Sequence, residues 1–425
     1  MALRPIAVDT ELHPCGGPEG LFCLGDAPER LEALVPEFGG RIKLIYLDPP
    51  FMTGERFYMR ARVGADQWRR GKGTLALETF VDQKDRAGLL ALMRRTLDLC
   101  RQLLSEDGMI FVHIDYRTHP HVRLLMDELF GEENFINEII WVYQSGGRSL
   151  RHFSRKHDVI LFYGKGENYD FNIEAVMGPR ETPRTSHMRR HVDPDGRVYR
   201  SIRSNGKVYT YYDDDPVAPT DVWQDLSHLQ QKDPERTGYD TQKPLALLDR
   251  IVRCASRPGD WVLDPFAGSG TTLEAAARNG RRFIGIDRCP VTPNLIRRRL
   301  RAANYRICRF VAQEGEAPRC EAEVNPGVGF YHVHLTGFEG RVDGMPEGSG
   351  AMDAVDNWSV GYLREEGYEV LSEFARSRRE PELKTELVVP VFAGELAMAV
   401  SDLAGRTWVY ALETQKNAPE FILGQ

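Results

Sequence analysis

Residues 48–51 read Asp-Pro-Pro-Phe and follow residues 41–47, Arg-Ile-Lys-Leu-Ile-Tyr-Leu, a run built like a buried strand. Each proline lacks a backbone N–H, so the pair cannot continue a sheet and the strand must end there. A carboxylate, a fixed carbonyl and an aromatic ring therefore stand at the carboxyl end of a strand, where ligands bind in open α/β sheets. Taken alone, such a tetrapeptide is more often an ordinary turn, and a second motif is needed to favour a site.

The second motif spans residues 261–277, an apolar strand followed by a glycine-containing loop and an alanine-rich helix. Glycines allow a ligand close to the backbone, and the helix N-terminus offers free N–H groups. Asp287 ends the next expected strand, 17 residues after Gly270, which suits a contact with ribose hydroxyls. Gly270 is followed by Thr271, Thr272 and Leu273, and Leu273 stands where a dinucleotide fingerprint would need a third glycine. The loop therefore favours a nucleoside carrying a small zwitterion over one carrying a pyrophosphate.

With these two motifs the chain resembles the β class of S-adenosylmethionine-dependent amino-methyltransferases of DNA, in which the catalytic motif precedes the cofactor motif. Further segments that carry the resemblance are residues 24–31, 108–115, 130–141, 157–165 and 239–244. Their order and spacing are most similar to the adenine modification subunits of type III restriction systems and their solitary relatives. The similarity covers roughly residues 20–305, and the combination of motifs is specific.

The resemblance implies an α/β, Rossmann-like methyltransferase fold, with a mostly parallel twisted sheet and helices on both faces. It also implies an inserted target-recognition region and a small β-rich C-terminal appendage. We expect residues 1–145 to form the catalytic half, 146–240 the base-pocket strand and recognition region, and 241–308 the cofactor half. Residues 309–425 are then the acidic appendage. A composition of 42% hydrophobic and 28% charged residues is that of a globular chain.

The resemblance also assigns site residues. The predicted catalytic residues are Asp48, Pro49, Pro50 and Phe51. The predicted cofactor-binding residues, for S-adenosylmethionine, are Asp26, Lys243, Pro244, Asp264, Phe266, Gly268, Ser269, Gly270, Thr271, Thr272 and Asp287. No metal ion is expected in this site.

The chemistry follows from the weak nucleophilicity of an exocyclic amine, whose lone pair is delocalised into the ring. If Asp48 and the Pro49 carbonyl accept the two amine hydrogens, the lone pair localises and can attack a sulfonium methyl in line. A duplex base must leave the stack to reach such a site, and Phe51 could stack on it. Methylation of cytosine carbon 5 would need a thiolate, and the only Pro-Cys pair, ending at Cys15, lies outside a strand-end context. We expect N6 of adenine as the target on family analogy, with N4 of cytosine as the alternative.

Charge is distributed unevenly along the chain. Residues 309–425 carry 20 acidic and 10 basic residues, a net charge of −10, so the remainder carries +3 of the total of −7. Residues 180–207 alone carry a net charge of +5, interleaved with histidine and tyrosine. Cations contact phosphates, and aromatic or arginine side chains can stack on bases or read base edges. The predicted DNA-binding residues are Arg148, Arg189, Arg190, Arg200, Arg203 and Lys207.

Three further expectations concern the rest of the chain. Seven scattered cysteines without a Cys-x-x-Cys pattern indicate reduced thiols in a cytoplasm, and no stretch has membrane-spanning length. Residues 55–83, with several arginines and glycines, are interpreted as a mobile loop. The arginines of an expected helix at 291–305 are interpreted first as solvated or salt-bridged, and second as facing DNA.

Double-stranded DNA is the partner that the resemblance implies. The resemblance leaves open whether the protein forms a homodimer and whether it binds a restriction or helicase–nuclease subunit. Two other classes of protein also stay open on the sequence. A non-catalytic, cofactor-holding DNA-binding subunit is disfavoured because the acid of residue 48 is intact. A nicotinamide oxidoreductase is disfavoured because the third glycine of its fingerprint is missing.

Overall fold

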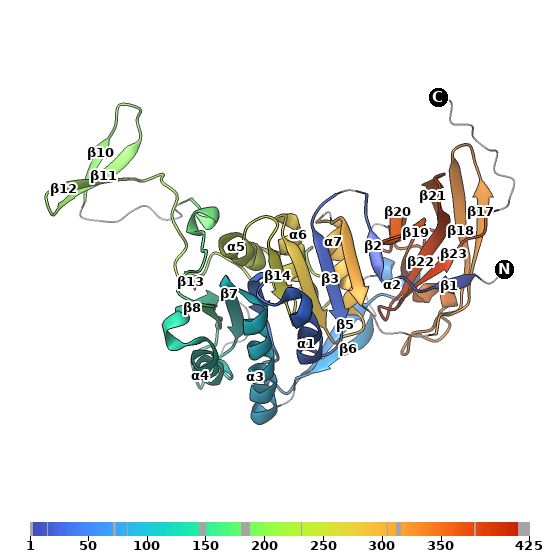
Figure 1. Cartoon of the computed structure of the whole chain (residues 1–425), viewed down its shortest axis with the longest axis horizontal. Helices are drawn as coiled ribbons and strands as arrows, with labels where there is room; N and C mark the ends of the chain where they lie inside the picture. The colour runs from blue at the N-terminus through green and yellow to red at the C-terminus, as the bar shows by residue number, and fades with distance from the viewer. Residues whose placement is uncertain are drawn as a thin grey trace.

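The computed structural model of the chain describes residues 3–14, 16–70, 74–82, 84–143, 150–179, 188–230, 232–303, 305–311, 316–377 and 380–414. Its centre is one 15-stranded sheet in which the strands at the core are parallel (Figure 1). The parallel neighbours are, in order across the sheet, β16 (Ile307–Val311), β3 (Glu19–Leu24), β15 (Arg282–Asp287), β14 (Trp261–Asp264), β4 (Ile42–Leu47) and β7 (Leu104–Ile114). Beyond β7 lie β9 (His157–Gly164), β8 (Phe135–Val142) and β13 (Val222–Trp223), and β9 is antiparallel to both of its neighbours. The predicted Rossmann-like α/β fold is confirmed.

Helices cover both faces of this sheet because side chains alternate along its buried strands. On one face, α1 (Ala27–Phe38), α3 (Arg86–Leu103) and α4 (His119–Phe130) pack against Ile45 and Leu47 of β4. On the other, α5 (Leu245–Ala255), α6 (Thr271–Arg278) and α7 (Thr292–Arg301) pack against Leu44 and Tyr46 of the same strand. Strand β4 is therefore buried on both sides, as its largely apolar sequence indicates.

The C-terminal region is rich in strands, as predicted, and its sheet is continuous with the central one. Strands β19 (Val355–Arg364), β20 (Gly367–Ala375), β22 (Glu395–Asp402) and β23 (Thr407–Ala411) extend the central sheet through β2 (Thr10–Leu12), and β1 (Arg4–Ile6) closes its edge. A second sheet of β17 (Cys320–Pro326), β18 (Phe330–Phe338) and β21 (Glu386–Pro390) covers them, and the two enclose a core around Trp358. The short 3₁₀ helix η3 (Ala351–Ala354) leads into β19.

Helix α7 joins the C-terminal region to the rest of the molecule through its arginines. Arg297 pairs with Glu11 of β2 and donates to Thr407 Oγ1 at 3.0 Å, Arg298 pairs with Asp356, and Arg301 pairs with Glu373 at 2.7 Å. The first of the two interpretations of these arginines, that they are salt-bridged, is confirmed.

The interpretation of residues 55–83 as a mobile loop is wrong for the part that the structure describes. Strands β5 (Arg56–Ala61) and β6 (Leu75–Val81) pair as an antiparallel hairpin, with α2 (Gly64–Arg70) between them. The far end of the hairpin is buried in the C-terminal core, where Ala61, Val63 and Leu75 pack. The sequence alone does not reveal this packing because the partners lie more than 240 residues away along the chain.

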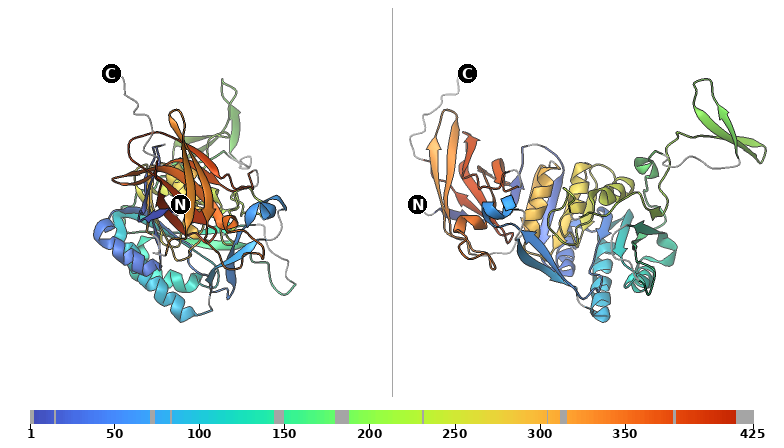
Figure 2. Two further views of the ribbon diagram at one scale, coloured as in Figure 1. Left: turned by 90° about the vertical axis from the view of Figure 1, so that its right-hand side faces the viewer. Right: turned by 180° about the vertical axis from the view of Figure 1, so that it is seen from behind.

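The region inserted before α5 contains a small sheet that stands apart from the body (Figures 1 and 2). Strands β10 (Arg189–Val192), β11 (Val198–Ser204) and β12 (Lys207–Tyr212) form it, and a turn at Asn205 and Gly206 joins the last two. Figure 2 shows it at the opposite end of the molecule from the C-terminal strands. Two 3₁₀ helices, η1 (Glu132–Asn134) and η2 (Ile173–Val176), complete the described elements.

Six of the seven cysteines lie in the described part of the chain, and all six are free and buried. Across the described ranges no helix is both long and apolar enough to span a membrane.

The junction between the hairpin and the C-terminal core gives the first prediction. Leu75→Ala should lower the free energy of unfolding by about 2–5 kcal/mol, since it leaves a cavity among buried side chains. Leu124→Ala, at a 69% exposed leucine of α4, is the control and should change it by less than about 0.5 kcal/mol. Urea unfolding followed by circular dichroism measures both, and equal values for the two variants would contradict this packing.

Candidate active site

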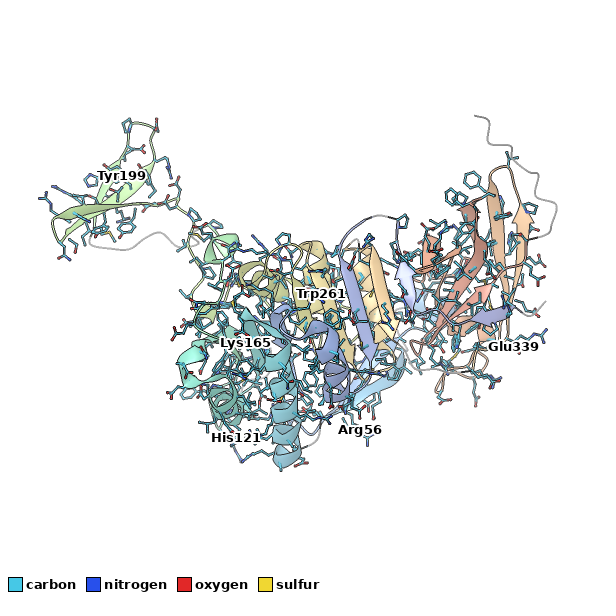
Figure 3. The ribbon with its side chains drawn as sticks, in the orientation of Figure 1. Arg56, His121, Lys165, Tyr199, Trp261 and Glu339 are labelled. Atoms are coloured by element: carbon cyan, nitrogen blue, oxygen red, sulfur yellow. The ribbon has the colours of Figure 1, made fainter. Side chains whose placement is uncertain are left out.

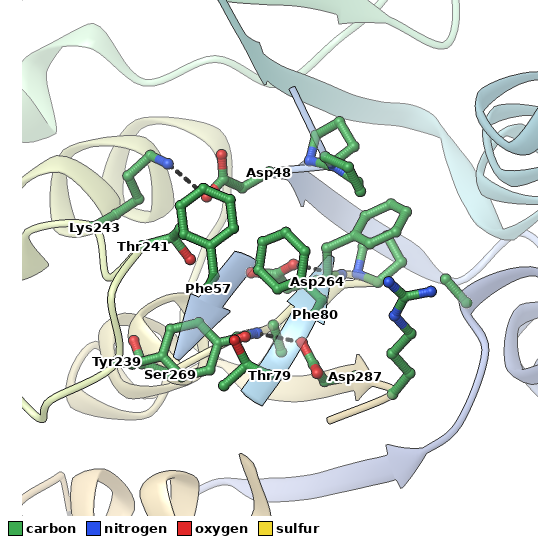
Figure 4. A pocket seen from close by; sticks show the side chains of 18 of the residues that line it. Asp48, Phe57, Thr79, Phe80, Tyr239, Thr241, Lys243, Asp264, Ser269 and Asp287 are labelled. Carbon is green, nitrogen blue, oxygen red and sulfur yellow. Dashed lines mark hydrogen bonds and ion pairs between the residues drawn. The ribbon is translucent and has the colours of Figure 1, made fainter. Parts of the chain in front are cut away.

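The two sequence motifs meet because β4 and β14 are adjacent and parallel. Their carboxyl ends lie at the same edge of the sheet, and one cavity opens there between residues 48–51 and the loop that follows β14 (Figure 4). Predicted residues that line this cavity are Asp26, Asp48, Pro49, Pro50, Phe51, Lys243, Asp264, Phe266, Gly268, Ser269, Thr271, Thr272 and Asp287. Pro244 and Gly270 lie next to it as the N-cap residues of α5 and α6.

Asp48 uses only one of its two carboxylate oxygens within the protein. Lys243 Nζ donates to Oδ2 at 2.5 Å, and the same ammonium lies 5.2 Å from the centre of the Phe51 ring. Oδ1 is buried and has no hydrogen-bond partner among the described residues. A buried acceptor without a donor is unfavourable, so this oxygen is suited to accept a hydrogen from a ligand in the cavity.

The loop after β14 requires glycine at two positions. Gly268 and Gly270 both have positive φ angles, +50° and +79°. A Cβ at Gly270 would lie 2.6 Å from Cγ1 of Ile296, so a larger residue would also clash with α7. The loop can therefore approach a ligand closely and still turn into the start of α6.

Asp287 holds this loop through its carboxylate. Oδ2 accepts from the Gly268 amide at 2.8 Å, and Oδ1 accepts from the Cys289 amide at 2.8 Å and from Thr292 Oγ1 at 3.3 Å. Because a carboxylate oxygen can accept two hydrogen bonds, Oδ2 has room for one more donor. This geometry is compatible with the ribose contact expected of Asp287 and adds a structural role to it.

Asp264 faces inward at the end of β14 and is bonded within the protein. The Phe266 amide donates to Oδ1 at 3.0 Å, and Thr272 Oγ1 donates to Oδ2 at 2.5 Å, so Asp264 ties the loop to α6. Burial of this carboxyl group raises its pKa, and the two hydrogen bonds lower it. The effect of burial is the larger, so the pKa rises to about 7.

Several lining residues were missed by the sequence analysis. Phe57 of β5 and Phe80 of β6 stack on each other with ring centres 4.8 Å apart, and both rings face the cavity. Asp82 follows β6, and Tyr239 lies beside Gly268. The run Thr-Phe-Val at residues 79–81, three residue types that favour strands, is a signal that could have indicated the second strand of this hairpin.

The predicted DNA-binding residues lie away from the cavity. Arg189, Arg190, Arg203 and Lys207 are exposed on the isolated sheet. Arg200 is less free, since its Nε donates to Asp213 at 3.2 Å and its side chain is only 16% exposed. Arg148 lies outside the described residues. Figure 3 shows Tyr199 among the side chains of this sheet.

The charge of the cavity suits a cation. Its carboxyl groups are those of five aspartates, whereas its cations are Lys243 and Arg288. A cationic sulfonium is favoured in such surroundings, and the pyrophosphate of a dinucleotide is disfavoured. The acidic lining, the free Asp48 oxygen and the glycine loop all fit S-adenosylmethionine. Within the described residues, no cluster of histidine, cysteine or carboxylate side chains could hold a metal ion.

Comparison with known proteins gives a family match over the same region. A model of a family described as DNA methylase matches residues 42–291, which contain both motifs and their strands. Type II methyltransferase M.EcaI from Enterobacter cloacae is 32% identical over 312 residues, covering 63% of this chain and 66% of the relative. DNA adenine methyltransferase YhdJ from Escherichia coli is 29% identical over 265 residues, covering 62% and 76%.

A third relative is the Mod subunit of the type III restriction-modification enzyme StyLTI from Salmonella typhimurium. It is 25% identical over 320 residues, covering 60% of this chain and 49% of the relative. The chain therefore spans about two thirds of the length of M.EcaI and about half that of the Mod subunit.

Asp264 gives a prediction about pH. Its pKa is raised from 3.8 in the unfolded chain to about 7, so between these values the native state binds the proton more tightly. The contribution of this group to stability is therefore present below about pH 4 and is lost as the pH rises toward 7. Asp264→Asn should remove this loss, because an amide does not titrate and Thr272 can reverse its hydroxyl to donate or accept.

Urea unfolding of the wild type and Asp264→Asn at pH 5 and pH 7 measures this difference. We expect the wild type to lose more stability than the variant between the two values. Equal losses would show that Asp264 does not hold a proton in this range.

Proposed function

This chain belongs to the DNA methylase family, and on that premise we propose that it transfers a methyl group from S-adenosylmethionine to N6 of adenine in double-stranded DNA. The observation that carries the proposal is the free Oδ1 of Asp48, which lies at the end of β4 beside the glycine loop at the end of β14. An acceptor for the target amine and a loop suited to the cofactor then share one cavity.

When bound, S-adenosylmethionine supplies an electrophilic methyl group on a sulfonium. Asp48 Oδ1 and the Pro49 carbonyl each accept one hydrogen of the exocyclic amine, which localises the nitrogen lone pair. Lys243 holds the other oxygen of Asp48 and so fixes the direction in which Oδ1 points. Phe51 stacks on the extruded base, and the apolar rings of Phe57 and Phe80 exclude water from the cavity.

Adenine is favoured as the target for two reasons. YhdJ, which the match covers over 76% of its length, is named as a DNA adenine methyltransferase. An acid at the first position of the catalytic motif is, in the family resemblance, commoner in adenine enzymes, whereas serine is commoner in cytosine enzymes. Both reasons are analogies between family members and not properties of the pocket.

The isolated sheet of β10, β11 and β12 supports a contact with DNA. Its cations and tyrosines project from both faces, and it has no hydrophobic core of its own. Its exposed cations Arg189, Arg190, Arg203 and Lys207 suit contact with the phosphates of nucleic acid. We extend the proposal to double-stranded DNA as the molecule that this sheet contacts. The resemblance to a Mod subunit also motivates the proposal of a restriction subunit as a further partner, and a homodimer remains a proposal as well.

Methylation itself is the most direct test of this function. Unmethylated DNA incubated with the protein and S-adenosylmethionine should yield N6-methyladenine in nucleoside mass spectrometry. Asp48→Ala should reduce the rate at least 100-fold, about 2.7 kcal/mol, while binding of S-adenosylmethionine measured by calorimetry stays within about twofold. Asp98→Ala, at an exposed position of α3, is the matched control and should retain the rate.

More than a tenth of the wild-type rate in Asp48→Ala would contradict the role of this carboxylate. N4-methylcytosine without N6-methyladenine would overturn the choice of base and leave the role of Asp48 intact.

The DNA surface is tested separately. Arg189→Gln, Arg190→Gln and Arg203→Gln together should weaken DNA binding and reduce its dependence on salt, by a slope of roughly 0.9 for each phosphate that is no longer neutralised. Arg200→Gln is the internal control, and we expect a smaller effect because Asp213 already pairs with that guanidinium. Fluorescence anisotropy with a labelled duplex at several salt concentrations measures both. Unchanged affinity in the triple variant would remove this sheet from the DNA interface.

A further inference from the structure

The residues just after the catalytic motif are bound by a carboxylate from the neighbouring hairpin. Asp82 follows β6 and is only 2% exposed. Its Oδ1 accepts from the Met52 amide at 2.9 Å. Its Oδ2 accepts from the Phe51 amide at 3.1 Å, from the Thr53 amide at 2.9 Å and from Thr53 Oγ1 at 2.9 Å. Three successive amides and one hydroxyl therefore converge on a single buried side chain.

The backbone around these bonds has a conformation that needs support. Met52 has a φ angle of +61°, in the left-handed region that side chains other than glycine rarely adopt. Two backbone hydrogen bonds close the same turn, from Gly54 N to the Asp82 carbonyl at 2.8 Å and from Asp82 N to the Glu55 carbonyl at 2.9 Å. A left-handed residue persists where its surroundings hold it, and successive amides directed at one carboxylate provide that support.

The position of this turn determines where the reacting groups stand. Phe51 is both the first residue held by Asp82 and the ring beneath the Lys243 ammonium, which in turn binds Asp48. Pro49 and Pro50 have no amide hydrogen with which to bond, so the catalytic segment is fixed by β4 on one side and by Asp82 on the other.

We propose that Asp82 is a positioning residue for the catalytic segment: it holds residues 51–53, and through them the Pro49 carbonyl and the Phe51 ring, in the geometry that receives the target base. Asp82 acts through the loop and not on the base, because it is 2% exposed and both of its oxygens bind groups of residues 51–53. The catalytic part of this proposal rests on the proposed methyl transfer, whereas the structural part does not.

The hairpin that carries Asp82 extends from the active site into the C-terminal core. Phe80 lines the cavity two residues before Asp82, and Leu75 of the same strand is buried among C-terminal side chains. The C-terminal region therefore contributes to the active site, because it anchors strand β6, which leads into Asp82.

Hydrogen exchange tests the structural part without relying on activity. Asp82→Asn keeps the shape of the side chain but turns one acceptor into a donor that faces backbone N–H groups. We expect the amides of Phe51, Met52 and Thr53 to exchange at least tenfold faster in this variant, with the amides of β4 unchanged. Wild-type exchange rates at these three amides would overturn the proposal, whatever the effect on methyl transfer.

Kinetics tests the positioning role. Asp82→Asn should lower kcat for DNA at least tenfold while the dissociation constant for S-adenosylmethionine changes less than twofold. Thr53→Val removes one of the four hydrogen bonds and should have a smaller effect in the same direction. Asp85→Asn is the matched control and should leave kcat unchanged. Asp85 lies three residues after Asp82 and also accepts from a backbone amide, that of Gly88 at 3.0 Å, but it caps α3 and does not bind the catalytic segment.

The two proposals fail in different ways. Faster exchange in Asp82→Asn together with no methyl transfer by the wild type would support the hold of Asp82 on the loop and reject the proposed function. Faster exchange with wild-type kcat in the variant would reject the positioning role and leave the proposed function intact.

Discussion

The parallel pairing of β4 with β14 is the constraint on which the rest of the site depends. The two strands are separated by more than 200 residues in sequence, and each ends in a motif that is ambiguous alone. Their pairing places a carboxylate with a free oxygen and a glycine loop at one edge of the sheet, the usual place for ligands in open α/β folds. Helices on both faces bury the strands, so their ends are held rigidly.

Four of the five aspartates of the cavity divide into two groups by their hydrogen bonds. Asp264, Asp287 and Asp82 bind backbone amides and thereby shape the loops. Among the residues that the structure describes, Asp48 binds the Lys243 side chain alone and keeps one oxygen for a ligand. One group of carboxylates therefore shapes the loops of the site, and Asp48 presents an acceptor to the ligand.

The sequence predicts what is encoded locally and misses what depends on distant packing. The strand before Asp48 ends at its prolines, and the strand after the glycine loop ends at Asp287, because proline and apolar patterns act over a few residues. The hairpin of β5 and β6 was missed because Leu75 is stabilised by the C-terminal core. Asp82 could not be identified because its role is defined by amides some 30 residues earlier in the chain.

A crystal structure with a non-reactive analogue of S-adenosylmethionine tests the central claim that the two motifs form one site. The account predicts that the analogue lies along the loop of residues 265–270, with its ribose hydroxyls at Asp287. The group that replaces the sulfonium methyl should point toward Asp48 and Pro49. An analogue bound elsewhere, or one whose sulfur-equivalent atom faces away from Asp48, would contradict the account.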